Sequence, residues 1–284
     1  MPHFIFAIVL SCLIVVYSRR KKSLTWDGAA AAFVLGMVTF SSSLSVFTVV
    51  LLTFFLTSSK LTKFKAERKR VLEAEYEASS ERNYVQVLCN GLAGGIAVIL
   101  FQALCESQNY TCFNQARWST VLLWAYIGHY GCCAGDTWAS ELGILNKELP
   151  ILVTTLKKVP AGTNGGVSGL GLAASFAGGT VVGLSAAITL FFEQPCHGFA
   201  WEIVLLGSFA GVVGSMIDSF LGATVQESLY SEDRKVIVSE RVPGENIKVI
   251  CGSAILDNHQ VNFLASFLTS SMCALAALYL YPTA

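Results

Sequence analysis

The charged residues of this 284-residue chain fall in blocks, and long segments between the blocks carry none. Lys, Arg, Asp and Glu are absent from residues 2–17, 28–59, 83–105, 118–135, 159–192, 203–217 and 258–284. A helix that spans a bilayer needs about 20 apolar residues, and backbone amides in lipid must bond within the chain, which requires helices. Charged residues make up only 13% of the chain, against about 25% in soluble proteins, so a water-soluble enzyme is ruled out as the leading interpretation.

The lengths of the uncharged segments indicate how many helices cross the membrane. Gly28–Ser59 is too long for one span and is expected to break at Ser41–Ser43 into two short helices. The segment 159–192 is expected to begin with a glycine-rich, non-helical stretch before a span near Val167–Phe192. We therefore predict an all-α fold, a polytopic helical membrane bundle of about eight helices, some short or broken. Residues 1–284 would form a single integral-membrane domain.

Basic residues set the expected orientation, because cytosolic loops are rich in Lys and Arg. Arg19–Lys22 and the segment 60–82, a charged helix or loop, are expected in the cytosol, as is the loop 227–250. The loop 106–117 would then face a lumen or the outside, and its sequon at Asn109 predicts glycosylation. The expected location is the endomembrane system or the plasma membrane. Because the net charge is zero, the expected partner is the lipid bilayer and not a nucleic acid.

Ionisable residues at membrane depth are costly, so each is a functional candidate. A first cluster ends an apolar segment with Asp136, Ser140, Glu141 and Gly143. If this stretch is helical, Asp136, Ser140 and Gly143 share a face, and the carboxylate could hold Mg²⁺, which prefers oxygen ligands. The alternative is structural: Asp136 could cap a helix that it opens.

A second cluster pairs two lysines, Lys157 and Lys158, with a glycine-rich turn that leads into a helix. The turn contains Gly162, Thr163, Asn164 and Gly165. Backbone N–H groups at a helix N-terminus attract anions, and lysine adds a point charge for phosphate. This is not a Walker A motif, because its lysines precede its glycines. The alternative is a positive membrane anchor followed by a flexible loop.

A third cluster comprises Asp218, Ser219, Gly222 and Gln226. Asp218, Gly222 and Gln226 follow one another at intervals of four and would line one helix face. Like Asp136, Asp218 precedes a hydroxyl residue at the end of an apolar segment, which is a faint internal repeat. Two such carboxylates could converge on a shared-metal or two-metal site. The alternative is a hydrogen-bonded helix pair without a ligand.

Polar side chains also enter two further helices from the same predicted side. They are Arg82, Asn83, Gln86 and Asn90 before and within one helix, and Asn258 and Asn262 at the start of the last. We consider them candidate substrate or phosphate contacts. The alternative is that the amides hold helices together inside the membrane.

These clusters resemble segments of the transmembrane protein 19 family. The matching segments are Phe55–Lys63, Arg82–Asn90, Asp136–Gly143, Lys157–Ser168, Asp218–Gln226 and Asp257–Phe263. The resemblance runs in order over almost the whole chain. That family includes plant phytyl-phosphate kinases of tocopherol synthesis and a plant glucose-responsive growth protein. A shorter resemblance connects the aspartate and lysine–glycine patterns with phytol and dolichol kinases, which use CTP.

The resemblance implies phosphoryl transfer from a nucleoside triphosphate, CTP or ATP, to an isoprenoid monophosphate such as phytyl or geranylgeranyl phosphate. Asp136 and Asp218 would hold Mg²⁺, with Glu141 as a further catalytic candidate. Lys157, Lys158, Asn164 and the backbone of the glycine-rich turn would bind phosphates, and the apolar helices would hold the isoprenoid tail. The alternative is a non-catalytic membrane protein, either a transporter or a glucose-responsive growth regulator.

Overall fold

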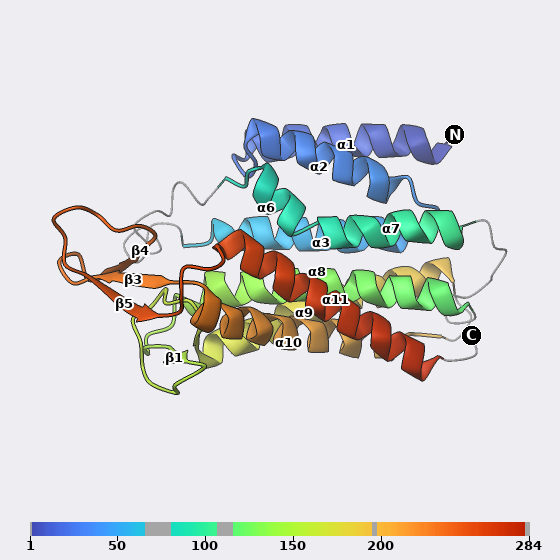
Figure 1. Cartoon of the computed structure of the whole chain (residues 1–284). Coiled ribbons are helices and arrows are strands. Elements are labelled where there is room, and N and C mark those ends of the chain that lie inside the picture. The colour runs from blue at the N-terminus through green and yellow to red at the C-terminus, as the bar shows by residue number, and fades with distance from the viewer. Residues whose placement is uncertain (1, 66–80, 107–115, 195–197, 282–284) are drawn as a thin grey trace.

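The computed structural model describes residues 2–65, 81–106, 116–194 and 198–281. This part of the chain forms nine helices. Most of them run roughly along one direction, and short strands extend from one end of the bundle (Figure 1). The helices are α1 (Pro2–Arg20), α2 (Trp26–Phe40), α3 (Ser45–Thr62), α6 (Tyr84–Cys89), α7 (Leu92–Leu104), α8 (Arg117–Gly143), α9 (Gly169–Glu193), α10 (Trp201–Val225) and α11 (Asn258–Leu280). Of these, α1, α3, α9, α10 and α11 are long and apolar enough to cross a membrane. The prediction of a helical membrane bundle is confirmed.

The predicted break at Ser41–Ser43 is present, because α2 ends at Phe40 and α3 begins at Ser45. Two carboxylates close this turn. Glu106 accepts a hydrogen bond from the backbone N–H of Ser43, and Glu193 accepts one from the N–H of Ser45 at 2.6 Å. Both N–H groups lie at the start of α3, where no carbonyl precedes them to accept their hydrogen bonds.

The uncharged segment 83–105 forms two helices, α6 and α7, where one span was expected. Asn83 and Gln86 form a reciprocal capping box at the start of α6, and α6 ends at Cys89, with Asn90 as its C-cap. A Cβ at Gly91 would lie 2.3 Å from the end of the Leu35 side chain and 3.0 Å from the Val87 carbonyl oxygen, so α2 packs closely against this break. The break lets α6 tilt across the end of the bundle (Figure 1).

Helix α8 is the centre of the bundle and packs against α3, α7, α9, α10 and α11. Every side chain from Ser119 to Gly135 is buried. Because its neighbours shield it from lipid, α8 carries more polar residues than the lipid-facing helices. An example is His129, which is fully buried and hydrogen-bonds the Asn90 carbonyl at 3.0 Å.

Glycines let α8, α9 and α10 approach backbone to backbone. A Cβ on Gly135 would lie 2.5 Å from Gly211, and a Cβ on Gly179 would lie 2.2 Å from the carbonyl oxygen of Gly207. Real Cβ atoms essentially never come within 3.0 Å of another heavy atom. These contacts fix the ends of α8 and α10 beside one another and thereby position Asp136 and Asp218.

Two small antiparallel sheets lie at one end of the bundle. Strands β3 (Ser228–Ser231), β4 (Val236–Val238) and β5 (Ile247–Cys251) form a three-stranded sheet in the order β4-β3-β5. Strand β1 (Ile151–Leu152) pairs with β2 (Gly166–Val167), which places Leu152 opposite Gly166. The segment 227–250, expected as a loop, therefore contains β3, β4 and most of β5, joined by turns.

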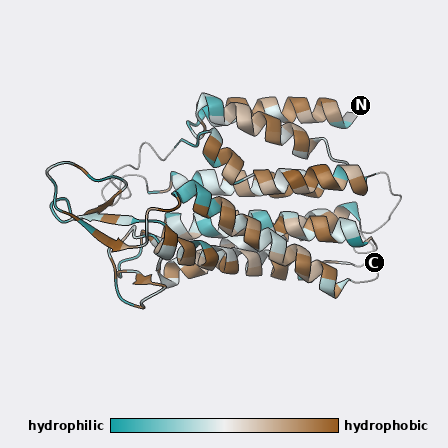
Figure 2. Ribbon diagram, viewed as in Figure 1, coloured by the Kyte–Doolittle hydropathy of each residue, from teal (hydrophilic) through white to brown (hydrophobic). Residues whose placement is uncertain are grey.

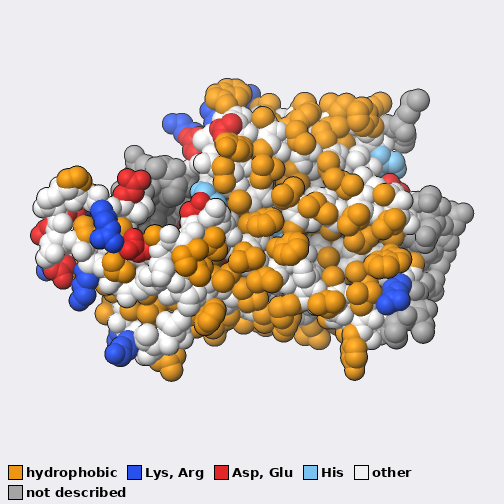
Figure 3. Space-filling model, viewed as in Figure 1, with side chains coloured by type: hydrophobic (Ala, Val, Ile, Leu, Met, Phe, Trp, Pro, Cys, Tyr) orange, Lys and Arg blue, Asp and Glu red, His pale blue; other side chains and the backbone are white. Residues whose placement is uncertain are grey.

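The same end of the bundle carries the basic residues after α1 and α3, the C-terminal ends of α8 and α10, and the start of α11 (Figure 1). Teal, hydrophilic residues gather there in Figure 2, and the helices are mostly brown along their length. In Figure 3, apolar side chains cover the bundle surface, and charged side chains gather at its ends and on the sheet. This distribution suits a bundle in lipid with its sheets in water. The cytosolic location of the sheet end stays a prediction. The assignment of residues 1–284 to a single membrane domain with cytosolic segments 60–82 and 227–250 also stays a prediction.

Candidate functional site

A polar cavity of about 380 Å³ opens at the sheet end of the bundle. Its lining includes Asp136, Thr137, Ser140, Glu141 and Gly143 of α8; Gly162, Thr163, Asn164, Gly165 and Ser168 of the loop before α9; Ser215, Asp218 and Ser219 of α10; Arg82, Gln86 and Asn90; and Asn258, His259 and Asn262 of α11. Segments far apart in sequence therefore converge on one site. We call this the polar cavity.

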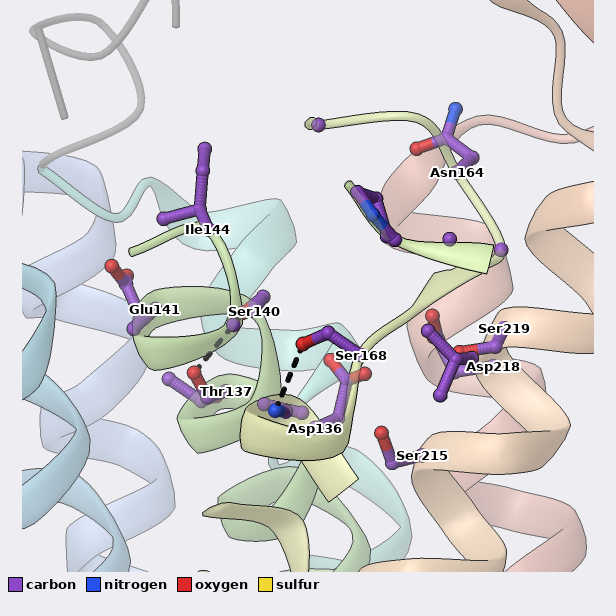
Figure 4. A pocket seen from close by; sticks show the side chains of 18 of the residues that line it. Asp136, Thr137, Ser140, Glu141, Ile144, Asn164, Ser168, Ser215, Asp218 and Ser219 are labelled. Carbon is purple, nitrogen blue, oxygen red and sulfur yellow. Dashed lines mark hydrogen bonds between the residues drawn. The ribbon is translucent and has the colours of Figure 1, made fainter. Parts of the chain in front are cut away.

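Asp136 of α8 and Asp218 of α10 both line this cavity (Figure 4). Both are half-buried, and their charges lie close enough to repel each other. Among the described residues, none donates a hydrogen bond to the Asp136 carboxylate. Asn262 donates to the Asp218 carboxylate and to the Asn258 carbonyl, each at 3.0 Å, when its amide nitrogen faces these acceptors.

The alternative in which Asp136 opens and caps a helix is wrong, because α8 runs unbroken from Arg117 to Gly143. Helices α8 and α10 run in the same direction, so Asp136 and Asp218 lie at matching ends of parallel helices (Figure 1). This arrangement is not an inverted repeat of the kind found in many transporters.

The remainder of the first cluster surrounds Asp136. Ser140 donates a hydrogen bond to the Thr137 carbonyl at 3.1 Å, and Glu141 also lines the cavity. A Cβ on Gly143 would touch Gly171 at 3.4 Å, so the last turn of α8 lies directly against the first turn of α9.

The glycine-rich loop is an ordered structure. Gly162 and Gly165 adopt left-handed φ angles of 85° and 75°, which suit glycine. A Cβ on Gly165 would lie 2.5 Å from the Ser219 carbonyl oxygen, so the loop backbone rests on α10. The prediction of a flexible loop, the alternative considered above, does not agree with this packing.

The three-stranded sheet fixes the same loop from outside. The N–H of Asn164 donates to the Ser228 hydroxyl at 3.0 Å, and the Cys251 thiol donates to the Asn164 carbonyl at 3.3 Å. The N–H groups of Thr163 and Gly166 donate to carbonyls within the loop at 3.3 and 2.9 Å. These three N–H groups therefore already donate hydrogen bonds within the protein. Only the other backbone N–H groups of the loop could bind a phosphate as predicted.

Helix N-termini supply a second source of positive potential. The first turns of α9 and α11 both line the cavity, through Ser168 and Gly171 and through Asn258 and His259. Ser168 caps α9 by accepting from the Gly171 N–H at 3.0 Å. The N-terminal end of a helix carries partial positive charge and favours anions.

Lys157 and Lys158 do not line the polar cavity. Both are exposed, and their backbone belongs to the β1 turn, where the Leu152 N–H donates to the Lys157 carbonyl at 2.9 Å. The structure also places Asn83 and Gln226 outside the cavity. Asn83 caps α6, and Gln226 follows the end of α10, so it does not extend the face of Asp218.

Arg82 contributes a cation at the α6 edge of the polar cavity. Its backbone is held by Ser23 and Thr25: its N–H donates to the Ser23 carbonyl at 3.1 Å, and its carbonyl accepts from the Thr25 N–H at 3.0 Å. Burial lowers the pKa of the Arg82 guanidinium, and the charge of Glu141 opposes that shift. The pair brings opposite charges to one wall.

The cavity includes residues that the sequence interpretation missed. Ser215 lies three positions before Asp218, and this spacing on a helix could have revealed it. Ser228 lies outside the cavity but holds Asn164, and it has no such signal, because it reaches Asn164 only through the fold of the sheet. The predicted glycosylation site at Asn109 lies outside the described residues.

The donor set suits a magnesium ion. In the part of the chain that the structure describes, no group of three or more His, Cys, Asp and Glu residues could hold a metal. Mg²⁺ does not need such a cage, since it usually keeps several waters and binds through one or two carboxylates and substrate phosphates. The carboxylates of Asp136 and Asp218, which line one cavity, fit that requirement.

Comparison with known proteins identifies a family of membrane proteins and several similar chains. The family described as integral membrane protein DUF92 matches residues 9–270. The chain is 42% identical to Protein PGR of Arabidopsis thaliana over 290 residues, 99% of each chain. It is 26% identical over 244 residues to an uncharacterised membrane protein of Methanocaldococcus jannaschii, covering 86% of this chain and 92% of the relative.

A further relative is Protein VTE6, chloroplastic, of Arabidopsis thaliana. The identity is 26% over 208 residues, which cover 72% of this chain and 57% of that protein. No solved structure matches.

Proposed function

Since the chain belongs to the DUF92 family of integral membrane proteins, with a match over residues 9–270, we propose that it is a membrane-embedded phosphotransferase. It would move the terminal phosphoryl group of a nucleoside triphosphate, CTP or ATP, to an isoprenoid monophosphate such as phytyl or geranylgeranyl phosphate. The resemblance to a family that includes plant phytyl-phosphate kinases supports this substrate class. The observation that carries the proposal is that Asp136 and Asp218 share one polar cavity with a glycine-rich loop and an arginine.

The reaction makes modest demands on the protein. An oxygen of the lipid monophosphate attacks the γ-phosphorus, the bond from that phosphorus to its bridging oxygen breaks, and a nucleoside diphosphate leaves. The products are an isoprenoid diphosphate and the nucleoside diphosphate. Because little covalent chemistry falls to the protein, catalysis consists mainly of positioning and charge stabilisation.

Each part of the polar cavity has a role in this scheme. Asp136 and Asp218 would hold Mg²⁺, which would neutralise charge on the phosphates. The first turns of α9 and α11 would orient phosphate oxygens, and Arg82 would bind the phosphate of the lipid. Asn164 and Ser219 line the cavity, and they would contact the transferred group.

The location of the cavity suits a lipid substrate. An isoprenoid phosphate lies with its head group at the membrane interface. The cavity is at the sheet end of the bundle, and apolar side chains cover the bundle surface (Figure 3). The protein is an integral, multi-pass membrane protein. We propose the endomembrane system or the plasma membrane as its location.

The test uses the purified full chain in nanodiscs with phytyl monophosphate, Mg²⁺, and CTP or ATP labelled at the γ-phosphate. Labelled diphosphate lipid is expected, and Asp136→Asn or Asp218→Asn should lower kcat by roughly 100-fold, the equivalent of losing about 3 kcal/mol of transition-state stabilisation. Glu202→Gln is the matched control, because Glu202 lies in the first turn of α10, at the opposite end from Asp218.

Absence of product with every nucleotide, from protein that is demonstrably folded, would refute the proposal. That outcome would favour the non-catalytic alternative.

A further inference from the structure

The turn that follows β1 carries an apolar side chain where turns usually carry Gly, Pro, Asn, Asp or Ser. We call residues 149–159, which form this turn and the chain on either side of it, the β1 hairpin. Leu156 in the turn is 78% exposed, and its φ of 56° lies in the left-handed region, which is costly for a residue with a Cβ. Leu149 and Ile151 are also exposed. The hairpin therefore presents three large apolar side chains that the protein itself does not cover.

Hydrogen bonds hold the β1 hairpin in one conformation. The Leu156 N–H donates to the Leu152 carbonyl at 2.8 Å, and the Leu152 N–H donates to the Lys157 carbonyl at 2.9 Å. At the base of the hairpin, the Val159 N–H donates to the Pro150 carbonyl at 3.0 Å. The side chain of Leu152 is buried, which fixes the strand against the protein. Because the exposed side chains are held in a fixed arrangement, the hairpin loses little conformational entropy when a partner binds them.

The charge of the β1 hairpin is positive. Residues 149–160 contain Lys157 and Lys158 but no Asp or Glu. Both lysines are exposed, and among the described residues no carboxylate forms an ion pair with either of them. Apolar side chains combined with lysines are typical of segments that lie in the interface of a membrane. The lysine stems can lie along apolar surface while the ammonium groups reach the phosphates of the lipids.

The β1 hairpin lies beside the start of a membrane-spanning helix. Ile151 pairs with Val167 of β2, and α9 begins two residues later at Gly169. In the first turn of α9, Leu170 and Leu172 are exposed, as side chains that face lipid are. Three residues of chain, at most about 10 Å, separate Val167 from Leu170, and interfacial segments bury their apolar face by about 5–10 Å. In Figure 1 the chain around β1 lies at the ends of the helices and extends to one side of them. The hairpin is therefore at the level of the lipid head groups.

We propose that the β1 hairpin inserts into the interface of the bilayer around the bundle, with Leu156 among the upper carbons of the acyl chains and Lys157 and Lys158 on the phosphates of anionic lipids. The continuity of the hairpin with the lipid-facing start of α9 favours the bilayer over a protein partner. The cytosolic leaflet, which the sheet end is predicted to face, contains anionic lipids. This inference does not depend on the proposed kinase activity, and it gives a role to two lysines that do not line the polar cavity.

The first experiment measures whether the tip of the hairpin is in lipid, with the full chain in nanodiscs. Leu156→Trp adds fluorescence to that of the unmodified protein, and the added signal should be shifted to shorter wavelength and quenched by lipids that carry bromine on their acyl chains. Val242→Trp is the matched control, because Val242 is also exposed but lies between β4 and β5 of the three-stranded sheet, and its added signal should not be quenched. Ile151→Trp serves as a second reporter if Leu156→Trp does not fold.

The second experiment compares brominated phosphatidylserine with brominated phosphatidylcholine as quenchers of the Leu156→Trp signal. Phosphatidylserine should bind at least about fivefold more tightly, the equivalent of about 1 kcal/mol for one lysine near an anionic surface. Adding Lys157→Gln and Lys158→Gln to the reporter should abolish this preference. Lys235→Gln with Lys248→Gln is the matched control, because it removes the same charge from exposed positions of the sheet segment and should leave the preference unchanged.

Emission and quenching of Leu156→Trp equal to those of Val242→Trp would place the tip in water and overturn the inference. A protein partner would then be the better explanation of the exposed leucine. Equal binding of the two lipids, or a preference that survives the loss of Lys157 and Lys158, would overturn the role of the lysines. Neither readout requires turnover, so these results and the test of the proposed function can fail separately.

Discussion

The contact between α9 and α10 at Gly179 can be tested by adding one methyl group. In the structure, a Cβ at Gly179 would lie 2.2 Å from the carbonyl oxygen of Gly207 and 2.9 Å from the Cα of Gly211. Ordinary van der Waals contact begins at 3.4 Å, so Gly179→Ala must separate the helices locally by about 3.4 − 2.2 = 1.2 Å. The obstacle is backbone and cannot rotate away.

Overpacking costs about 1–3 kcal/mol, and a backbone obstacle places this site at the upper end. Alanine is the better helix former by about 1 kcal/mol, which offsets part of the cost. The expected net loss in the free energy of unfolding is about 2 kcal/mol, roughly a 30-fold change in the ratio of folded to unfolded protein.

The assay is equilibrium unfolding of the purified protein in mixed micelles, compared with Gly169→Ala. Gly169 begins the same helix, and a Cβ there meets nothing within 4 Å, so this control should be neutral or slightly stabilising. If Gly179→Ala unfolds within about 0.5 kcal/mol of this control, which is the usual range for a surface substitution, the close packing of α9 on α10 is refuted.

Three further variants, one of them a double substitution, test other parts of the structure. Ser228→Ala removes the hydroxyl that accepts a hydrogen bond from the Asn164 N–H. The loss of about 1 kcal/mol should raise KM for the nucleoside triphosphate roughly fivefold. Unchanged kinetics would show that the sheet does not hold the loop. Asp257→Ala removes the capping box of α11 and should lower the free energy of unfolding by about 1 kcal/mol, with Asp257→Asn retaining most of it in the same unfolding assay. Replacing both Lys157 and Lys158 with Ala should change turnover less than about twofold, because both residues are exposed and lie outside the polar cavity. A large loss of turnover would show that these lysines act at the site.

Much of the bundle follows from the distribution of charge along the sequence. Uncharged segments must form helices in lipid, and the break at Ser41–Ser43 follows from the length of the segment that contains it. The same reasoning places Asp136 and Asp218 at one end of the bundle. Their convergence depends further on the close glycine contacts between α8 and α10, which no single segment reveals.

Other features depend on tertiary structure. Lys157 and Lys158 adjoin the glycine-rich loop in sequence, but the β1 turn directs them away from it. The strands of the segment 228–251 are short, and their pairing forms only when the sheet assembles beside the loop.

The most direct test of a shared magnesium site is a double-substitution cycle at Asp136 and Asp218, measured as kcat for transfer of labelled phosphate from the nucleoside triphosphate to phytyl monophosphate. If both carboxylates serve one site, each single change to Asn should lower kcat by roughly 100-fold, and the double change should cost little more, because residues that act as a unit are strongly non-additive. A double variant near 10,000-fold slower, the product of two independent losses, would contradict the shared site, as would single variants that retain full activity.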